Sequence, residues 1–366
     1  MTEVAGHNLP FDSRGAPEHR GRAAVLNTAN RFEPLHVELD PVEPDSEEAE
    51  RPAARTRFFV DSSRSALAEN DSPDLGFRFS INPYRGCEHG CIYCYARPSH
   101  EYLGFSAGLD FETKILVKQN LPELLAAEFR RNSWQPQTVA LSGNTDCYQP
   151  VERRLGITRR CLQTFLEFRN PVTIITKNHL VTRDLDLLVE LAALDLVHVT
   201  LSITSLRPEL TNIMEPRTSR PQRRLRAIEQ LAEAGVPAGV NVAPLIPGLT
   251  DHEAPEILKE VAARGGRWAG FQIVRLPGAV APLFLDWLKR NLPDRAEKVV
   301  GRIGKVRGGG ISDSRFGSRF TGEGELADLT RRLFEMARRK HGLDRSDHRL
   351  TTRHFRRGGG EQLELF

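Results

Sequence analysis

Long apolar runs are missing from this 366-residue sequence, in which hydrophobic residues make up 39% of the total. No stretch approaches the roughly 20 apolar residues that a membrane-spanning helix needs. The first residues also lack the charged and apolar regions of a secretory signal peptide. The sequence therefore predicts a cytoplasmic protein, in a compartment where thiols stay reduced.

Cysteine is scarce as well, with five residues in the chain. An odd cysteine count without a secretory signal argues against a disulfide framework. Three of the five nevertheless lie close together, as Cys87, Cys91 and Cys94 in the run NPYRGCEHGCIYCYAR over residues 82–97. Thiolates are soft ligands that suit iron–sulfur clusters and zinc, so this loop predicts a metal centre.

The spacing C-x3-C-x2-C helps to distinguish between the possible kinds of metal centre. Three ligands fill three corners of a cubane cluster and leave one iron free to bind another molecule, whereas bacterial ferredoxins use C-x2-C-x2-C with a distant fourth cysteine. The alternative is a structural zinc site with three cysteines and His89 or His100 as the fourth ligand. A zinc ribbon would not need the long alternating domain that follows.

The pattern C-x3-C-x-aromatic-C resembles the signature of the radical S-adenosylmethionine (SAM) superfamily. The wider run NPYRGCEHGCIYCYARPSHEYLG resembles its spore photoproduct lyase-like branch, which is also called DNA repair photolyase-like. The resemblance implies a [4Fe-4S] cluster held by Cys87, Cys91 and Cys94, with SAM on the fourth iron. An electron donor such as flavodoxin or ferredoxin would reduce the cluster, and SAM cleavage would give a 5′-deoxyadenosyl radical that abstracts hydrogen from a substrate.

Short β-branched strands alternate with helical segments from about residue 77 onward. We expect strands over 77–81, 138–142, 172–176, 197–202, 237–242 and 268–274, and helices over 121–131, 158–168, 182–193, 221–234, 252–264 and 281–291. Such alternation predicts an α/β fold with a parallel sheet and helical crossovers. The resemblance narrows this to a partial (β/α)6 TIM-like barrel.

Charge and composition divide the chain into four parts. We expect a disordered or loosely packed N-terminal arm over 1–75, the radical SAM barrel over 76–292, a basic, mostly helical extension over 293–357 and a flexible tail over 358–366. Residues 301–357 hold 15 Lys or Arg and 7 acids, an excess of +8. This excess favours a nucleic-acid partner; the alternative is a solvated basic face that packs against the acidic residues 38–50.

Polar residues follow four consecutive predicted strands, at the strand ends where barrels of this kind gather their chemistry. The resemblance implies that Ser142, Gly143 and Asn144 hold the amino group of SAM, and that Lys177 pairs with its carboxylate. It also implies contacts from Ser202 to the carboxylate or ribose and from Tyr93 and Asn241 to the adenine. For the small polar residues, helix caps and turns are the alternative.

Three further side chains have less settled roles. Arg217 could reach the SAM carboxylate or belong to a surface turn. Cys147 follows the second strand and could return a hydrogen atom to a product radical, although a buried structural thiol explains it equally well. Tyr95 is a second hydrogen relay candidate. Cys161 lies on the apolar face of a predicted helix and is expected in the core.

The last five residues form a separate motif behind the glycines at 358–360. Gln362, Leu363, Leu365 and Phe366 match the Q-L-x-L-F pattern with which bacterial DNA polymerases and repair proteins bind the sliding clamp. A frayed terminus is the alternative.

The sequence thus predicts a radical SAM enzyme of lyase or transferase type that acts on nucleic acid, in DNA repair or base modification. Modification of RNA or a peptide is one alternative. A non-catalytic, metal-stabilised protein that binds DNA or the clamp is another.

Overall fold

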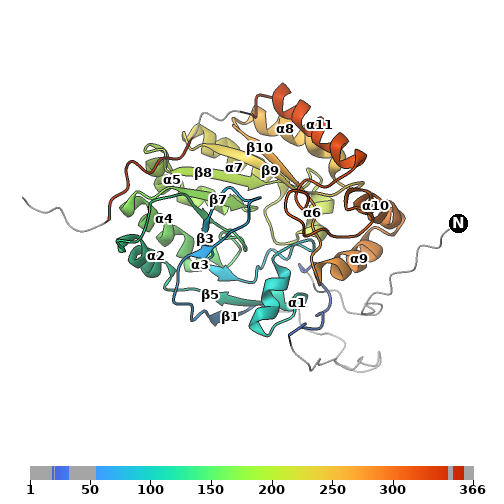
Figure 1. Cartoon of the computed structure of the whole chain (residues 1–366), viewed down its shortest axis with the longest axis horizontal. Coiled ribbons are helices and arrows are strands. Elements are labelled where there is room, and N and C mark those ends of the chain that lie inside the picture. Colours follow the sequence, from blue (N-terminus) through green and yellow to red (C-terminus); the bar gives the residue numbers. More distant parts are fainter. Residues whose placement is uncertain (1–18, 20, 33–54, 345–348, 358–366) are drawn as a thin grey trace, which may run out of the picture.

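A curved sheet of seven strands forms the centre of the chain (Figure 1). The computed structural model describes residues 19, 21–32, 55–344 and 349–357. The sheet has the order β10–β9–β8–β7–β6–β3–β2. Its parallel strands are β3 (Phe79–Ile81), β6 (Val139–Leu141), β7 (Val172–Thr176), β8 (Val197–Ser202), β9 (Ala238–Leu245) and β10 (Ala269–Ile273), and β2 (Ala68–Glu69) pairs antiparallel with β3. All six expected strands are present in sequence order, which confirms the α/β fold and the partial barrel.

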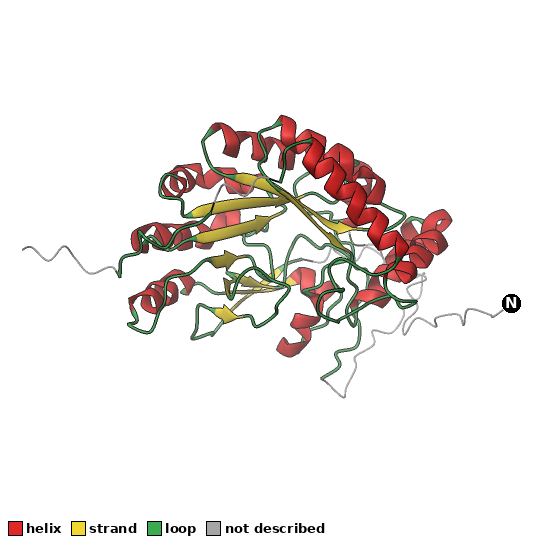
Figure 2. Cartoon of the chain, turned by 45° about the horizontal axis from the view of Figure 1, so that its top comes forward, coloured by secondary structure: helices red, strands yellow, loops and turns green. Residues whose placement is uncertain are grey.

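Helices connect the successive parallel strands and lie on the outer side of the sheet (Figure 2). The main ones are α2 (Leu121–Arg130), α4 (Ile157–Phe168), α5 (Leu185–Ala192), α7 (Pro221–Glu233), α8 (Ala254–Ala263) and α9 (Val280–Asn291). Each lies where the sequence predicted a helix. Shorter elements fill the connections: α1 (Leu109–Thr113), α3 (Glu152–Leu155), α6 (Pro208–Met214) and the 3-10 helices η2 (Arg97–Leu103), η3 (His179–Asp184) and η4 (Asp251–Glu253).

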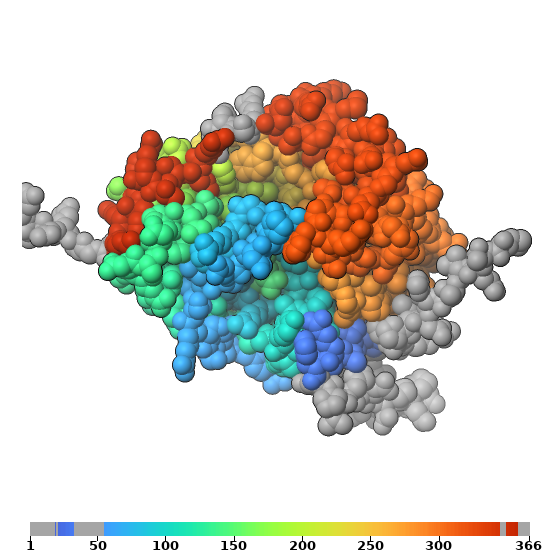
Figure 3. Space-filling model, in the orientation of Figure 1, coloured from blue at the N-terminus to red at the C-terminus, as the bar shows by residue number. Residues whose placement is uncertain are grey.

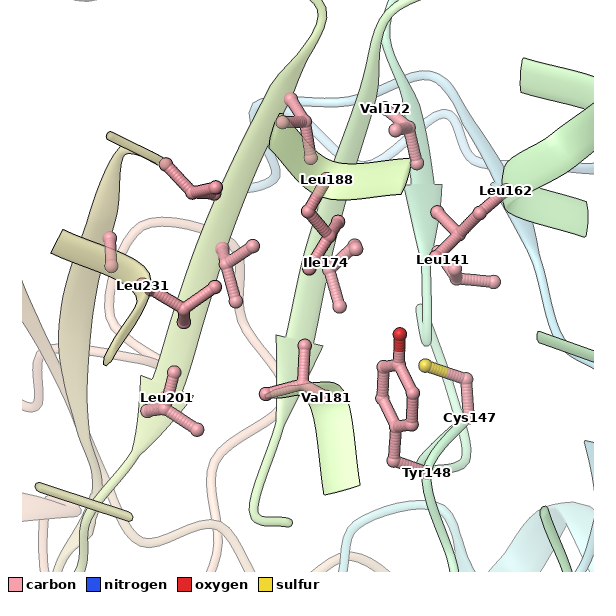
Figure 4. Packing of buried hydrophobic residues seen from close by; sticks show 14 of the residues in the cluster. Leu141, Cys147, Tyr148, Leu162, Val172, Ile174, Val181, Leu188, Leu201 and Leu231 are labelled. Atoms are coloured by element: carbon pink, nitrogen blue, oxygen red, sulfur yellow. The ribbon is translucent and has the colours of Figure 1, made fainter. Parts of the chain in front are cut away.

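Apolar side chains between the sheet and these helices form the main core. Strand residues such as Leu141 and Ile174 are fully buried against Leu162 of α4 and Leu188 of α5 (Figure 4). Burying a side chain of this size contributes about 1.5–3 kcal/mol relative to leaving it exposed. Cys161 lies in the same cluster with no exposed surface, so its predicted core position is confirmed. This core holds the strand ends in fixed positions.

Two segments of the arm over 1–75, which we expected to be disordered or loosely packed, pack against the rest of the chain. Strand β1 (Arg57–Val60) pairs in parallel with β5 (Lys114–Val117), which also pairs with β4 (Tyr84–Arg85) in a second, three-stranded sheet. The backbone N–H groups of Ala23 and Ala24 donate to the buried Glu112 carboxylate. Composition missed these contacts because their partners lie tens of residues away. The acidic residues 38–50 lie outside the described residues.

The C-terminal extension packs on the barrel through two long helices. These are α10 (Pro293–Val306) beside α9 and α11 (Glu325–Lys340) beside α8. Phe334 of α11 packs against Phe271 of β10 with ring centroids 4.6 Å apart and the rings tilted by 43°. The buried guanidinium of Arg307 donates to the carbonyls of Ile273 and Val274, which ties the extension to the end of β10. None of the helices in the described part of the chain has the length and apolarity for a bilayer crossing.

Candidate active site

The three clustered cysteines lie on the loop between β4 and η2 and line one cavity of about 450 Å³. The loop turns twice, because the N–H of Gly90 donates to the Cys87 carbonyl and the N–H of Cys94 to the Cys91 carbonyl. Cys87 and Cys91 are buried and Cys94 is half-buried. Local backbone bonds thus present all three thiols to the same space.

A buried arginine holds this loop from behind. Arg97 has no exposed surface and donates to the backbone carbonyls of Cys91, Gly90, Ala107 and Gly108. It also forms a salt bridge with the fully buried Glu112, 2.5 Å away. A guanidinium can satisfy several acceptors at once in a fixed geometry. The sequence analysis assigned no role to Arg97, although it ends the quoted cysteine run.

The two histidines that could complete a structural zinc site have other neighbours. Among the described residues, no three His, Cys, Asp or Glu side chains are grouped so as to hold one metal ion. His89 contacts Asp146 and Asn178 instead, and His100 lies between the rings of Phe105 and Phe111. In a four-iron cluster each cysteine binds a different iron, so the thiols need not converge on one point.

Burial changes the protonation of these thiols. It raises the pKa of Cys91 and Cys94, and that of Cys87 well above the ordinary value, with the nearby Asp146 charge adding to the effect on Cys87. Metal binding requires thiolates and therefore releases protons. A metal group bound here would therefore have to displace protons from buried thiols.

The predicted SAM-binding residues gather around the same cavity. Gly143 and its neighbours follow β6, Lys177 follows β7, and Ser202 and Asn241 are paired neighbours on β8 and β9. The cavity wall contains eight of the predicted residues: Tyr93, Tyr95, Ser142, Gly143, Asn144, Lys177, Ser202 and Asn241. Their ligand contacts stay predictions, but the fold brings them together with the cysteines.

The turn after β6 requires its glycine. A Cβ atom on Gly143 would lie 2.6 Å from the Cβ of Ser80 on β3, closer than such atoms approach. Ser142, beside it, has a φ of +81°, and its hydroxyl accepts a hydrogen bond from the Cys147 N–H. The Asn144 N–H donates to the side chain of Asn82. The turn is therefore fixed from both sides, with its backbone close to the cavity.

A buried ionic network supports the wall beneath Tyr93. Glu215 accepts from the Tyr93 hydroxyl and from Arg224, which has no exposed surface, and its carboxylate lies 3.7 Å from Lys177 Nζ. Burial alone would raise the pKa of Glu215, but the charges of Arg224 and Lys177 and the hydrogen bonds it accepts lower that pKa on balance. The same carboxylate and burial raise the pKa of Tyr93 well above its ordinary value.

Asp146 links the cysteine loop to the end of β7. It accepts hydrogen bonds from the Lys177 N–H at 2.7 Å and from the Thr176 hydroxyl at 2.8 Å, and His89 Nδ1 lies 3.3 Å away. Sequence reasoning missed Asp146 and Arg224. The polar run after the second strand signalled Asp146, but nothing in the sequence paired it with a histidine 57 positions earlier.

Two predicted site residues are not brought to the cavity. Cys147 is fully buried behind Ser142, beside Tyr148 and among the apolar side chains of the main core (Figure 4). Arg217 pairs with Glu88 at 3.2 Å and with the Thr56 hydroxyl. Its expected contact with SAM is therefore not supported by its position, because Glu88 already engages its charge.

Comparison with known proteins agrees with this geometry. The model of the Radical SAM superfamily matches residues 81–261, which contain the cysteine loop and the strand ends as far as β9. Residues 81–261 are a radical SAM domain. Such domains use a [4Fe-4S] cluster and SAM, and the predicted cofactors thus agree with the family.

Solved structures with the same fold include those of spore photoproduct lyase. The enzyme complexed with dinucleoside spore photoproduct has a TM-score of 0.56 at 18% identity, over 83% of this chain and 85% of that one. A mutant with bound SAM and the dinucleoside product has a TM-score of 0.54 at 19% identity, over 78% of each chain. At this identity the likeness establishes the fold of the radical SAM domain and its flanking segments.

Curated relatives are more similar in sequence but uncharacterised. One from Mycobacterium tuberculosis is 40% identical over 222 residues, which cover 60% of this chain and 65% of the relative. Another from Methanocaldococcus jannaschii is 30% identical over 178 residues, 49% of this chain and 64% of the relative. The chain thus spans somewhat less than two thirds of these relatives.

Proposed function

We propose that this chain is a radical SAM enzyme whose [4Fe-4S] cluster is held by Cys87, Cys91 and Cys94. The observation that carries the proposal is the shared cavity, which places three thiols from one loop opposite the polar ends of β6 to β9. When bound, the cluster and SAM supply a 5′-deoxyadenosyl radical that abstracts hydrogen from the substrate. The protein binds and orients these groups and keeps water away.

Each cavity residue has a role in this proposal that its position allows. Lys177, held above the Tyr93 ring, binds the SAM carboxylate as a point charge. The turn at 142–144 binds the amino group, and Gly143 lets the backbone approach the ligand closely. Ser202 contacts the ribose of SAM and Asn241 contacts its adenine. Glu215 and Arg224 position Lys177 and Tyr93 without touching the ligand.

Tyr95 is a better hydrogen relay than Cys147. Tyr95 is 49% exposed, lines the cavity and donates its hydroxyl to the Gly143 carbonyl at 2.9 Å. Cys147 lies behind the wall, where a substrate radical could not reach it without opening the core. We therefore assign the relay to Tyr95 and a packing role to Cys147.

Nucleic acid is the proposed substrate class. The excess of +8 charges over residues 301–357 supports it, and so does the fold shared with an enzyme whose structures contain a dinucleoside photoproduct. The proposed reaction belongs to DNA repair or base modification in the cytoplasm, of lyase or transferase type.

The clamp-binding motif at Gln362, Leu363, Leu365 and Phe366 lies outside the described residues and stays a prediction. Deleting it should abolish clamp binding.

The test is SAM cleavage by anaerobically reconstituted protein with dithionite as the reductant. The wild type should hold about four irons per chain and release 5′-deoxyadenosine. Cys91→Ala should lose both, whereas Cys161→Ala, a buried cysteine in the core, should keep its iron. One zinc per chain without SAM cleavage would instead favour the non-catalytic alternative.

A further inference from the structure

The cavity has an outer part that the proposed cofactors do not explain. Two segments far apart in sequence form this part together with the end of β10, and we call it the mouth. It comprises residues 70–77, residues 272–275 and residues 316–320. The cavity lining from these ranges includes the basic and aromatic residues Arg275, Phe316, Arg319 and Phe320 and one acid, Asp71. Figure 3 shows the blue segment around residue 70 against the orange segment after residue 310 on this face.

The two segments of the mouth are fastened to each other. Asp74 forms a salt bridge with Arg319, with Nε and Oδ2 2.8 Å apart, and accepts the Gly317 N–H at 2.9 Å. Arg319 also donates to the Ser72 hydroxyl. Its guanidinium lies 4.6 Å from the Phe316 ring centroid and 4.8 Å from that of Phe320. The positive charge of Arg319 is thus matched within the protein.

Arg275 is different, because Asp74 and Asp313 favour its charge only from a distance. Its Nε is buried and has no hydrogen-bond partner among the described residues, and no carboxylate there forms a salt bridge with it. Its contact is the ring of Phe320, 5.1 Å from the guanidinium. Burial and the charge of Arg319 lower the pKa of Arg275. A half-buried guanidinium without a salt bridge is costly unless a bound anion completes it.

The aromatic side chains beside it offer a flat surface. Phe316 is 61% exposed and has one face on Arg319, and Phe320 lies between Arg319 and Arg275. Exposed rings interleaved with arginines are the usual platform for single-stranded nucleic acid, in which bases stack and guanidinium groups bind phosphates. An acidic peptide would satisfy the charge of Arg275 but would leave the exposed ring of Phe316 without a partner.

We propose that the mouth binds single-stranded nucleic acid, with Arg275 on a backbone phosphate and Phe316 beneath a neighbouring base. Arg275 acts as a bidentate donor to the phosphate oxygens. The inference rests on the proposed nucleic-acid substrate and adds where and how that substrate is held. It also assigns Arg275 to the substrate, and the strand ends of the inner wall to SAM.

The test measures binding of short fluorescein-labelled DNA and RNA strands of equal sequence to cluster-loaded, SAM-saturated protein by fluorescence anisotropy. Arg275→Ala should weaken binding about tenfold, the loss expected for a charge-assisted phosphate contact. It should also reduce the slope of log Kd against log salt by about 0.7, the contribution of one single-strand phosphate. Arg275→Lys should recover much of the slope. Arg264→Ala, an arginine paired with Glu260 on α8, is the matched control and should leave binding unchanged.

Phe316→Ala separates stacking from charge, because it should weaken binding without changing the salt slope. Tighter binding of the DNA or of the RNA strand identifies which of the two the mouth prefers. If Arg275→Ala leaves the slope unchanged, or instead weakens SAM binding, the inference is wrong while the proposed function stands. If the wild type binds neither strand but binds an acidic peptide, the nucleic-acid substrate and the mouth assignment both fail, whereas SAM cleavage would still be observed.

Discussion

The inner wall of the cavity and its mouth are built in opposite ways. The inner wall consists of the cysteine loop and the ends of β6 to β9, and its buried charges are paired: Glu112 with Arg97 and Glu215 with Arg224. The mouth consists of the end of β10 and two segments outside the parallel strands, and it leaves Arg275 without a salt bridge. The difference indicates that the inner wall is prepared for a fixed pair of cofactors, and that the mouth gains its missing partner from the substrate.

The largest effect should come from the arginine behind the cysteine loop. Arg97→Ala removes four backbone contacts and leaves Glu112 buried without its cation, which costs about 3–5 kcal/mol. We expect a lower free energy of unfolding and loss of most of the iron, measured by denaturant titration and iron assay. Arg78→Ala, whose salt bridge with Glu69 is exposed, is the control and should retain its iron. Full iron content in Arg97→Ala would show that the loop does not depend on this scaffold.

Lys177→Ala should weaken the binding of SAM without affecting the binding of the cluster. Loss of a charged contact to the SAM carboxylate should weaken SAM binding about tenfold or more, since hydrogen bonds to charged groups contribute about 1.5–3 kcal/mol. The iron content should stay at the wild-type value, because Lys177 is not a cluster ligand. Equilibrium dialysis with radiolabelled SAM measures this, with the exposed Lys259→Ala as control. Unchanged SAM affinity would leave Lys177 as a purely structural partner of Glu215.

Gly143→Ala should damage the inner wall through a steric clash. The new methyl group would meet the Ser80 Cβ at 2.6 Å, and such overpacking costs about 1–3 kcal/mol. Ser80→Gly removes the opposing atom, so the double variant should recover part of the lost stability. Thermal unfolding of the two single variants and the double variant measures this coupling. Additive losses would mean that the turn can move away from β3.

The smallest effect should come from weakening the contact between the two segments of the mouth. Asp74→Asn removes one charge from the largely buried salt bridge with Arg319 but keeps an oxygen that can accept the Gly317 N–H. We expect little change in global stability but faster cleavage by trypsin at Arg315 or Arg319, because the extension would separate more often from residues 70–77. Mass spectrometry of the early fragments identifies the cut sites. Cleavage at the wild-type rate would indicate that the contact between Asp74 and Arg319 does not fasten the extension.

The sequence predicted the barrel and most of the inner wall. The strands over 172–176 and 197–202 were predicted to the residue, because β-branched runs bounded by turns mark buried parallel strands. Lys177 and the turn at Gly143 could be placed because strand ends of one sheet share an edge. The pairing of Ala23 with Glu112 and of Asp74 with Arg319 could not, because each joins segments that are distant in sequence and carry no shared periodicity.

For single residues the sequence left two roles open where burial decides between them. Cys147 follows the same strand as Gly143, and only the three-dimensional course of the turn directs its thiol into the core and away from the cavity. Arg217 carries a charge suited to SAM, but Glu88 in the cysteine loop engages it first. The sequence offered no sign that Arg275 lacks a salt bridge, since that property depends on how near Asp74 and Asp313 come to its guanidinium in the fold.

The most direct test of the account is electron paramagnetic resonance of the dithionite-reduced protein, recorded with and without SAM. If the three thiols and the strand ends form one site, the spectrum of the reduced cluster should shift when SAM is added, because SAM binds the iron that has no cysteine. Lys177→Ala should require more SAM for the same shift. A cluster spectrum that does not change at saturating SAM, or no cluster signal at all, would contradict the proposal that this cavity holds both cofactors.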